Sequence, residues 1–350
     1  MIRLLLVGAG HAHAAFLAAA AKAPIYGARI TLVTPHAAQL YSGMLPGVLA
    51  GHYRLQEAQF DVARLAERSF ADLVVGEVRS LDPHRRAAIL PDGRELHFDV
   101  ASLNVGSLTD ISVPGSAVHA IAVKPFEPFL AGLSAASVAR VAVVGGGAAG
   151  TELAMAIRHR GAHVTLYSDR PAFPPQFAAR IAAQLRWRGV DLRQGMAVSA
   201  VEAGPVVHAG AARQAFDLVV WTAGAAPMPW LVRSGLALDD QGFVVVDATL
   251  RSVSHPEVFA VGDCATLRDA PHARSGVYAV RQGQVLETNL RKLAQGGALE
   301  PYRPQKKALV LLSCGARYAI AGHGNWSAQG RWVWWWKNWI DRRWIKRLAA

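Results

Sequence analysis

Residues Gly145 to Gly150 read Gly-Gly-Gly-Ala-Ala-Gly and satisfy the spacing Gly-x-Gly-x-x-Gly, directly after an apolar run and directly before an alanine-rich segment. At a turn from strand to helix, Gly145 would permit the tight turn and Gly147 would let backbone amides approach a pyrophosphate, while Gly150 would let helix and strand pack closely. The helix N-terminus itself also favours an anion. The motif therefore predicts a dinucleotide site, and a purely structural glycine turn is the less favoured alternative.

A weaker form of the same pattern, Gly-Ala-Gly-His-Ala-His, lies near the N-terminus. Gly8 and Gly10 fill the first two glycine positions, but His13 stands at the third, so the fold must accommodate an imidazole there. Thr34 stands where an acidic residue usually accepts hydrogen bonds from a ribose hydroxyl. We interpret His11 and His13 as turn or capping residues near a bound nucleotide. The 13 histidines show no spacing typical of a metal site, and we predict no metal.

Each glycine motif lies within a strand–turn–helix–strand unit that the hydrophobic pattern predicts. The first unit comprises a strand at Arg3–Val7, a helix at about His13–Lys22 and a strand at Ile30–Thr34. The second unit comprises a strand at Arg140–Val144, a helix at about Thr151–His159 and a strand at His163–Ser168. Such a repeat implies parallel strands joined by right-handed crossovers. We therefore predict an α/β protein with two Rossmann-like dinucleotide-binding domains.

Nucleotide preference is determined at the end of the second strand of such a unit. An acidic residue there favours NAD, and a nearby arginine can bind the 2′-phosphate of NADP. Ser168, Asp169 and Arg170 offer a hydroxyl, a carboxylate and a guanidinium in succession. The same residues are also typical of a solvated turn before Pro171. We expect Asp169 and Arg170 to contact the nucleotide, and the choice between NADH and NADPH stays open.

The chain has 350 residues and a formal net charge of +12. This charge suits nucleotides, acidic lipid surfaces or nucleic acid, but no nucleic-acid-binding motif accompanies it, so we expect no nucleic-acid partner. The first apolar run ends at Gly8, too soon for a secretion signal, and no apolar stretch reaches the ~20 residues that span a bilayer. Cys264 and Cys314 form no Cys-x-x-Cys pair, which suits a reducing compartment. We expect a cytoplasmic protein, peripheral on the inner face of the cell membrane if it meets lipid.

Six of the ten tryptophans lie near the C-terminus among arginines and lysines. Helical spacing predicts an apolar face made of Trp332, Val333, Trp335, Trp336, Trp339 and Ile340. It predicts an opposite, polar face made of Lys337, Asn338, Asp341 and Arg342, with Trp334 on the polar side. Tryptophan settles at the headgroup level and cations attract anionic lipid, so residues 331–348 are predicted to form a membrane-surface helix. The alternative is a helix packed on the protein itself or on a second copy in a homodimer.

Two further segments support the first unit: residues 99–107, Asp-Val-Ala-Ser-Leu-Asn-Val-Gly-Ser, and residues 255–265, His-Pro-Glu-Val-Phe-Ala-Val-Gly-Asp-Cys-Ala. With the glycine motifs, they resemble the two-domain flavoproteins of the pyridine nucleotide-disulfide oxidoreductase superfamily. That superfamily includes type II NADH dehydrogenases and sulfide:quinone oxidoreductases, and the resemblance covers most of the chain. It implies that the aspartate of the second segment meets the ribityl hydroxyls of FAD. This aspartate is Asp263, which follows Gly262. The same resemblance implies that the turns containing Gly106 and Gly224 connect the two domains.

Residues 40–47 and 278–283 are most similar to a subgroup of NADH dehydrogenase-like flavoproteins, some of which occur fused to selenophosphate synthetase. Similarity to type II NADH dehydrogenases implies that Glu152 approaches the flavin and the nicotinamide, and that Gln282 reaches a quinone pocket. The dithiol-containing relatives carry two cysteines where this chain has Tyr41 and, five residues later, a proline. We therefore expect Tyr41 on the substrate side of the flavin and exclude a disulfide reductase.

The resemblance implies an enzyme that passes electrons from NAD(P)H through FAD to a quinone. One alternative is a sulfide:quinone oxidoreductase-like enzyme, for which only Cys264 and Cys314 could carry sulfur. Another is a flavin-bearing redox sensor or partner-binding module. We expect an FAD-binding domain at residues 1–108 and 240–296, an NAD(P)H-binding domain at 109–239, and a C-terminal region at 297–350.

Overall fold

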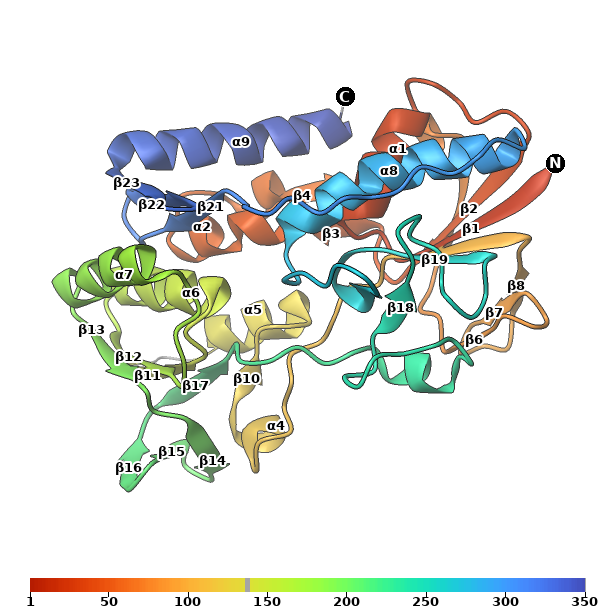
Figure 1. The fold of residues 1–350 in the computed structure, drawn as a ribbon. Coiled ribbons are helices and arrows are strands. Elements are labelled where there is room, and N and C mark those ends of the chain that lie inside the picture. The colour runs from red at the N-terminus through yellow and green to blue at the C-terminus, as the bar shows by residue number, and fades with distance from the viewer. Residues whose placement is uncertain (136–138, 350) are drawn as a thin grey trace.

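The computed structural model describes residues 1–135 and 139–349. Its first domain is built on a parallel sheet in the strand order β19-β9-β1-β2-β5 (Figure 1). These strands are β1 (Ile2–Val7), β2 (Ala28–Thr34), β5 (Ala71–Val75), β9 (Val100–Leu103) and β19 (Val258–Ala260). Helix α1 (His11–Ala20) packs against α8 (Gly276–Ala294) and is buried on nearly every side, which its run of alanines permits. The first predicted unit is confirmed.

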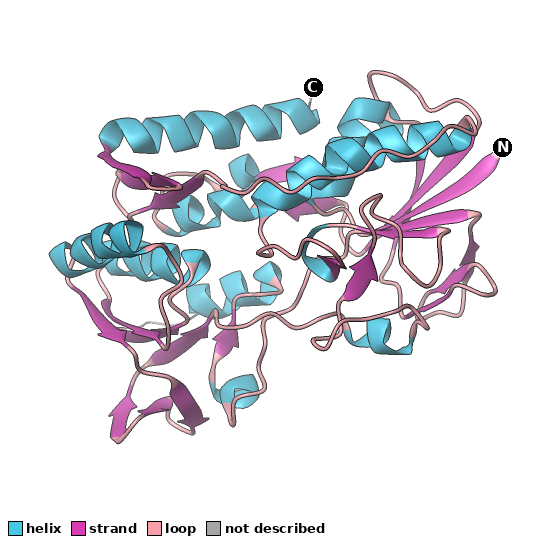
Figure 2. Ribbon diagram, in the orientation of Figure 1, coloured by secondary structure: helices cyan, strands magenta, loops and turns pink. Residues whose placement is uncertain are grey.

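The second domain repeats this plan with the strand order β10-β17-β11-β12-β13. Its strands are β10 (Ile121–Ala122), β11 (Arg140–Val144), β12 (His163–Ser168), β13 (Val190–Gln194) and β17 (Leu218–Trp221), all paired in parallel. Helices α6 (Ala148–His159) and α7 (Pro175–Trp187) lie together on one side of this sheet (Figure 2). Strands β11 and β12 have the predicted bounds, and α6 begins three residues earlier than predicted.

Shorter elements connect and extend the two sheets. Those before the second sheet are β3 (Ala38–Leu40), η1 (Ser42–Met44), α2 (Leu45–Leu49), η2 (Leu55–Ala58), β4 (Gln59–Asp61), α3 (Val62–Arg68), β6 (Ser80–Asp82), β7 (Ala87–Ile89), β8 (Glu95–His97), α4 (Ser116–His119) and α5 (Phe126–Ala135). Later ones are β14 (Val198–Glu202), β15 (Val206–Ala209), β16 (Ala212–Ala215), η3 (Pro229–Arg233), β18 (Val244–Val246), η4 (Gly262–Cys264) and β20 (Ala265–Leu267).

The hydrophobic cores do not follow the expected domain boundaries closely. Trp230 and Leu231 pack in the core of the first domain, although the boundary was expected after residue 239. Conversely, Met44 packs in the second core together with Leu312 and Ile320 from the C-terminal region. Within the described residues, the chain therefore re-enters the first domain closer to Gly224 than to residue 239. The domain boundaries remain a prediction.

The C-terminal region forms a three-stranded antiparallel sheet followed by the long helix α9 (Arg331–Ala349). Helix α9 crosses this sheet and continues to α1, α3 and β4 of the first domain (Figure 1). It is thus packed on the protein along its length. The strands of the sheet are β21 (Val310–Ser313), β22 (Ala319–His323) and β23 (Trp326–Gly330).

The faces of α9 differ from the prediction. The inner face buries Val333, Trp334, Lys337, Asp341, Trp344 and Leu348. Lys337 and Asp341 were expected in solvent, and that prediction is wrong because opposite charges four residues apart on a helix pair with each other and can be buried together. The outer face leaves three tryptophans about half exposed, namely Trp332 (55%), Trp335 (53%) and Trp339 (56%).

Candidate functional site

The turn after β1 is held against the turn after β9 by the side chain of Asn104. A Cβ added to Gly8 would lie 2.6 Å from the Asn104 carbonyl oxygen, and one added to Gly10 would lie 2.5 Å from its Oδ1, so only glycine fits at both positions. Asn104 Oδ1 accepts hydrogen bonds from the amides of Ala12 and His13 at 3.0 and 3.1 Å. The predicted glycine turn is therefore a close approach of two backbones.

His13, at the third glycine position, is fully buried, and both of its ring nitrogens have hydrogen-bond partners. Its Nδ1 lies 2.6 Å from the carbonyl oxygen of Gly8, and its Nε2 lies 2.8 Å from Ser102 Oγ. Because the carbonyl can only accept, Nδ1 donates and Nε2 accepts from the hydroxyl in the neutral ring. Burial lowers the pKa of His13 to about 4, which keeps the ring neutral. In this motif a third glycine usually lets helix and strand pack closely. Here the imidazole of His13 instead links α1 to Gly8 and to Ser102 on β9.

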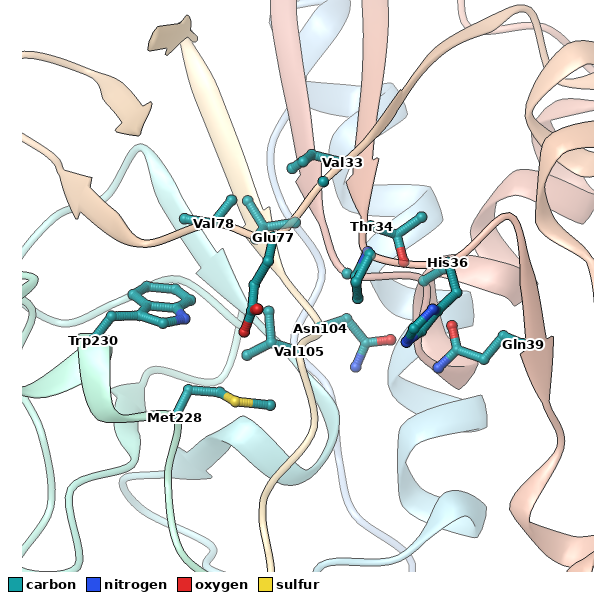
Figure 3. A pocket seen from close by; sticks show the side chains of 15 residues that line it. Val33, Thr34, His36, Gln39, Glu77, Val78, Asn104, Val105, Met228 and Trp230 are labelled. Carbon is teal, nitrogen blue, oxygen red and sulfur yellow. The ribbon is translucent and has the colours of Figure 1, made fainter. Parts of the chain in front are cut away.

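A cavity opens at the carboxyl ends of β1, β2, β5 and β9, where open α/β sheets bind their ligands (Figure 3). Gly8, Thr34 and Asn104 lie in its wall, and Thr34 is buried at the end of β2. The glycine cradle and this cavity fit the adenosine and pyrophosphate parts of a dinucleotide such as FAD.

Asp263 lies at the start of η4, beside the N-terminus of α1. Its Oδ2 is 3.0 Å from Nζ of Lys124, which also donates to Ser107 Oγ at 3.1 Å. Gly106 adopts φ +73, and no atom lies within 4 Å of the position of an added Cβ. Burial lowers the pKa of His11, with the charges of Asp263 and Lys124 acting in opposite directions. Lys124 is a candidate site residue that no sequence motif indicated.

The second glycine motif forms the predicted tight turn. Gly145 adopts φ +119, and its Cβ would lie 2.5 Å from Thr222 Oγ1, while a Cβ on Gly150 would overlap the carbonyl oxygen of Gly145. Gly147, in contrast, faces open space, with no atom within 4 Å of an added Cβ. A Cβ on Gly146 would likewise overlap the Ser168 side chain, so of these four glycines only Gly147, the position predicted to face a pyrophosphate, is open.

A cavity of about 320 Å³ adjoins this turn. Asp169 and Arg170 line it from the end of β12, and Gly224 lines it from the turn after β17. The amide of Arg170 donates a 2.8 Å hydrogen bond to Asp169 Oδ1, and the Arg170 side chain is 86% exposed. The structure therefore brings together both residues that were predicted to contact the nucleotide, and Arg170 Nε lies 3.8 Å from Asp169 Oδ2.

Glu152, on the second turn of α6, is buried with 9% of its surface exposed. Its Oε1 accepts a 2.7 Å hydrogen bond from the amide of Ser313. Burial raises the pKa of Glu152 to about 7, against the opposing effects of the Lys337 charge and the Ser313 hydrogen bond. A carboxyl group that titrates near neutrality can take up and release a proton under ordinary conditions.

Three further polar groups surround this acid, and two of them come from α9. Lys337 Nζ lies 2.8 Å from Asp341 Oδ2 and donates to the carbonyl oxygen of Gly43 at 2.7 Å. Burial opposes the charge of Lys337, but the carboxylates of Asp341 and Glu152 outweigh it and raise its pKa. Burial, followed by the charge of Asp341, raises the pKa of Tyr41. We name Glu152, Lys337, Asp341 and Tyr41 the buried acid cluster.

Glu152 and Tyr41 were predicted as site residues from the sequence, whereas Lys337 and Asp341 on α9 were not. A usable signal was present, because Trp334, Lys337, Asp341 and Trp344 share one helical face. A pair of opposite charges between two tryptophans is more consistent with a buried ion pair than with a solvated surface.

An aromatic contact joins α9 to the first glycine turn. The rings of His11 and Tyr41 meet edge to face with centroids 5.4 Å apart, and Trp344 lies 6.3 Å from the first and 6.2 Å from the second. Tyr41, at the position expected to face the flavin, therefore connects the other members of the acid cluster with the turn expected to bind FAD.

Gln282 is 1% exposed, inside α8. Its Oε1 accepts a 2.6 Å hydrogen bond from the amide of Gly262, and its Nε2 lies 3.2 Å from His272 Nε2. These contacts hold the turn that carries Asp263. The predicted place of Gln282 at a quinone pocket stays a prediction.

Both cysteines are fully buried. Burial raises the pKa of Cys264 to about 11 and that of Cys314 to about 12. Since the thiolate is the reactive form, neither residue is placed to act as a nucleophile or a sulfur carrier.

Comparison with known proteins agrees with this geometry. A family model described as pyridine nucleotide-disulphide oxidoreductase matches residues 2–283. The NADH dehydrogenase-like protein YutJ of Bacillus subtilis is 28% identical over 250 residues, which cover 67% of this chain and 68% of the relative. The resemblance identified from the motifs is thus confirmed.

Solved structures share the complete fold. The sulfide:quinone oxidoreductase of Aquifex aeolicus gives a TM-score of 0.84 over 99% of this chain and 91% of that chain, at 14% identity. NDH2 of Plasmodium falciparum, in complex with NADH, gives a TM-score of 0.81 over 99% and 97% of the two chains, at 13% identity. The chain belongs to the pyridine nucleotide-disulphide oxidoreductase family and is an FAD-dependent oxidoreductase that uses NAD(P)H.

Proposed function

We propose that the protein passes electrons from NAD(P)H through FAD to a quinone, and that Glu152 supplies a proton during quinone reduction. The observation that carries the proposal is the burial of Glu152, with a pKa of about 7, in the helix that follows the nucleotide turn of the second domain and near enough to Tyr41 of the first for its charge to raise the Tyr41 pKa. The similarity to NADH dehydrogenase-like proteins supports the same class of reaction.

The chain's own residues would position the reactants and handle protons. The turns at Gly8 and Gly145 would hold the two dinucleotides, with Asp263 at the ribityl hydroxyls. When bound, FAD supplies the hydride and electron chemistry between nicotinamide and acceptor. Glu152 Oε1 is engaged by the Ser313 amide, so Oε2 is the atom that would hold and deliver the proton. Lys337 would balance the charge that remains on Glu152 afterwards.

The sulfide-oxidising alternative receives less support. It requires cysteines that form thiolates beside the flavin, but Cys264 and Cys314 are buried and their pKa values are raised to about 11 and about 12. The likeness to a sulfide:quinone oxidoreductase is at 14% identity and concerns the fold.

We also propose that α9 binds the membrane surface with its outer face. Trp332, Trp335 and Trp339 are exposed at helical spacing, and Arg343 lies over the Trp339 ring at 5.3 Å. Indole rings beside cations suit the headgroup region of an anionic bilayer. In the described part of the chain, no helix is both long and apolar enough to cross a membrane.

The test is an anaerobic titration of the purified holoprotein with NADH and with NADPH, followed by a soluble quinone. Either nucleotide should bleach the flavin absorbance, and quinone should restore it faster than oxygen admitted to a matched reduced sample does. In a parallel sample, sulfide should leave the flavin oxidised. Reduction by sulfide, or reoxidation by oxygen as fast as by quinone, would contradict the proposal.

A further inference from the structure

The first domain lacks the acid that usually binds the adenosine ribose. In a dinucleotide-binding domain, that acid stands at the end of the second strand and accepts hydrogen bonds from ribose hydroxyls. Here β2 ends in Thr34, which is 3% exposed. The site must therefore recognise adenosine by other means, or bind it less tightly.

A neighbouring strand end supplies a carboxylate. The amide of Gly76, just after β5, donates a 2.9 Å hydrogen bond to the carbonyl oxygen of Thr34. This bond fixes Glu77 beside the end of β2. Glu77 is exposed, and among the described residues that line the cavity it alone carries a carboxylate. Figure 3 shows its side chain extending into the cavity between Val78 and Asn104.

The opposite wall of the cavity is apolar. Trp230 and Met228 form it, with the indole ring facing the Glu77 carboxylate across the cavity (Figure 3). Trp230 is 7% exposed and packs in the core of the first domain, so its ring is fixed by its neighbours. A fixed indole is a suitable surface for stacking a purine, an interaction that contributes roughly 1–3 kcal/mol per base in nucleic-acid complexes.

We infer that Glu77 and Trp230 together bind the adenosine half of FAD. Glu77 accepts hydrogen bonds from the hydroxyl or amine donors of adenosine, in place of the acid missing at Thr34, and Trp230 stacks on the purine. The inference rests on FAD occupying the first domain and is independent of the acceptor that the enzyme reduces. Trp230 lies on η3, which follows the second domain in the sequence, so FAD would also fix the segment that connects the two domains.

The test measures FAD binding to apoprotein prepared by removing the flavin, using the quenching of flavin fluorescence. The variants are Glu77→Gln, Trp230→Leu and Trp230→Phe. Glu67→Gln, on the exposed face of α3, is the matched control. Thermal unfolding of each apoprotein checks the fold, and Glu77→Gln should leave it unchanged because the side chain is exposed.

Glu77→Gln should raise the Kd for FAD roughly tenfold or more, since a hydrogen bond to a charged group is lost. Trp230→Leu should raise it by a similar factor, and Trp230→Phe should retain most of the affinity. Glu67→Gln should match the wild type. A Kd for Glu77→Gln within about twofold of the control, or equal values for the two Trp230 variants, would overturn the inference. A failure of quinone reduction would not affect this measurement, because it uses neither nicotinamide nor quinone.

Discussion

The ammonium group of Lys337 lies 2.8 Å from the carboxylate of Asp341, and only 10% and 6% of the two side chains are exposed. Lys337 also donates to the carbonyl oxygen of Gly43, in the segment that follows Tyr41. The C-terminal helix therefore contributes to the interior of the site while it presents tryptophans on its outer face. One helix thus connects the buried acid cluster with the proposed membrane surface.

Removing one partner of this ion pair should destabilise the fold. Lys337→Met leaves the Asp341 carboxylate buried without its cation and should lower the free energy of unfolding by about 3 kcal/mol. The double variant Lys337→Met/Asp341→Leu should recover most of that loss. Arg342→Met removes the exposed pair with Glu57 and should change stability by less than about 1 kcal/mol. Chemical denaturation measures all three, and a Lys337→Met variant as stable as the wild type would contradict the assignment.

The raised pKa of Glu152 should appear as a pH dependence of stability. Its ordinary value is 4.5 and burial raises it to about 7, so the folded state binds the proton more tightly than the unfolded state. This contribution is complete below the unfolded pKa and is lost as the pH rises through about 7. The unfolding free energy of wild type minus that of Glu152→Gln should therefore fall by about 3 kcal/mol from about pH 4 to pH 8. A difference that stays constant with pH would refute it.

Gln282 permits a test between its predicted role and its observed contacts. Gln282→Leu removes the hydrogen bond to the Gly262 amide, so the turn carrying Asp263 should loosen and FAD should dissociate faster. We expect roughly a tenfold loss of FAD affinity, as for a buried amide left unsatisfied. Gln284→Leu, two residues along α8, is the comparison. If Gln282→Leu retains FAD and slows only reoxidation by quinone, the residue reaches the quinone pocket as the sequence resemblance implied.

The outer face of α9 should bind anionic liposomes. Replacing Trp332, Trp335 and Trp339 by serine should weaken partitioning roughly tenfold or more, because three indole rings are lost from the headgroup region. Added salt should weaken the remaining attraction. Trp187→Ser, on the exposed surface of α7, is the control. Substitution is a cleaner test than deletion of the helix, which would also remove Lys337. Equal partitioning of the triple variant and the control would argue that α9 has only a structural role.

Local patterns predicted the two nucleotide-binding units well. Each unit is a short, contiguous segment in which glycine spacing and strand periodicity agree, and β11 and β12 have the expected bounds. His13 was recognised as an exception to the motif. Its partner Ser102 lies 89 residues away, a contact that no local pattern could indicate.

The parts of the site that were missed depend on contacts between distant segments. The role of Glu152 was predicted from the resemblance to type II NADH dehydrogenases, but its surroundings include Ser313 and Lys337, which follow it by more than a hundred residues. The tail was assigned an apolar and a polar face from hydrophobicity alone. The observed inner face is determined by two domains and an ion pair, so Trp334 and Lys337 lie inside and Trp335 lies outside.

Stopped-flow spectroscopy of the two half-reactions tests the central claim most directly. It compares wild type, Glu152→Gln and, as a matched control, Glu127→Gln on α5. Wild type and control should be reduced by NADH or NADPH much faster than free FAD and reoxidised by quinone. Glu152→Gln should be reduced normally but reoxidised roughly a hundredfold more slowly, the effect of losing a general acid. Wild-type flavin that neither nucleotide reduces faster than free FAD, or a Glu152→Gln variant that quinone reoxidises at the wild-type rate, would contradict the account.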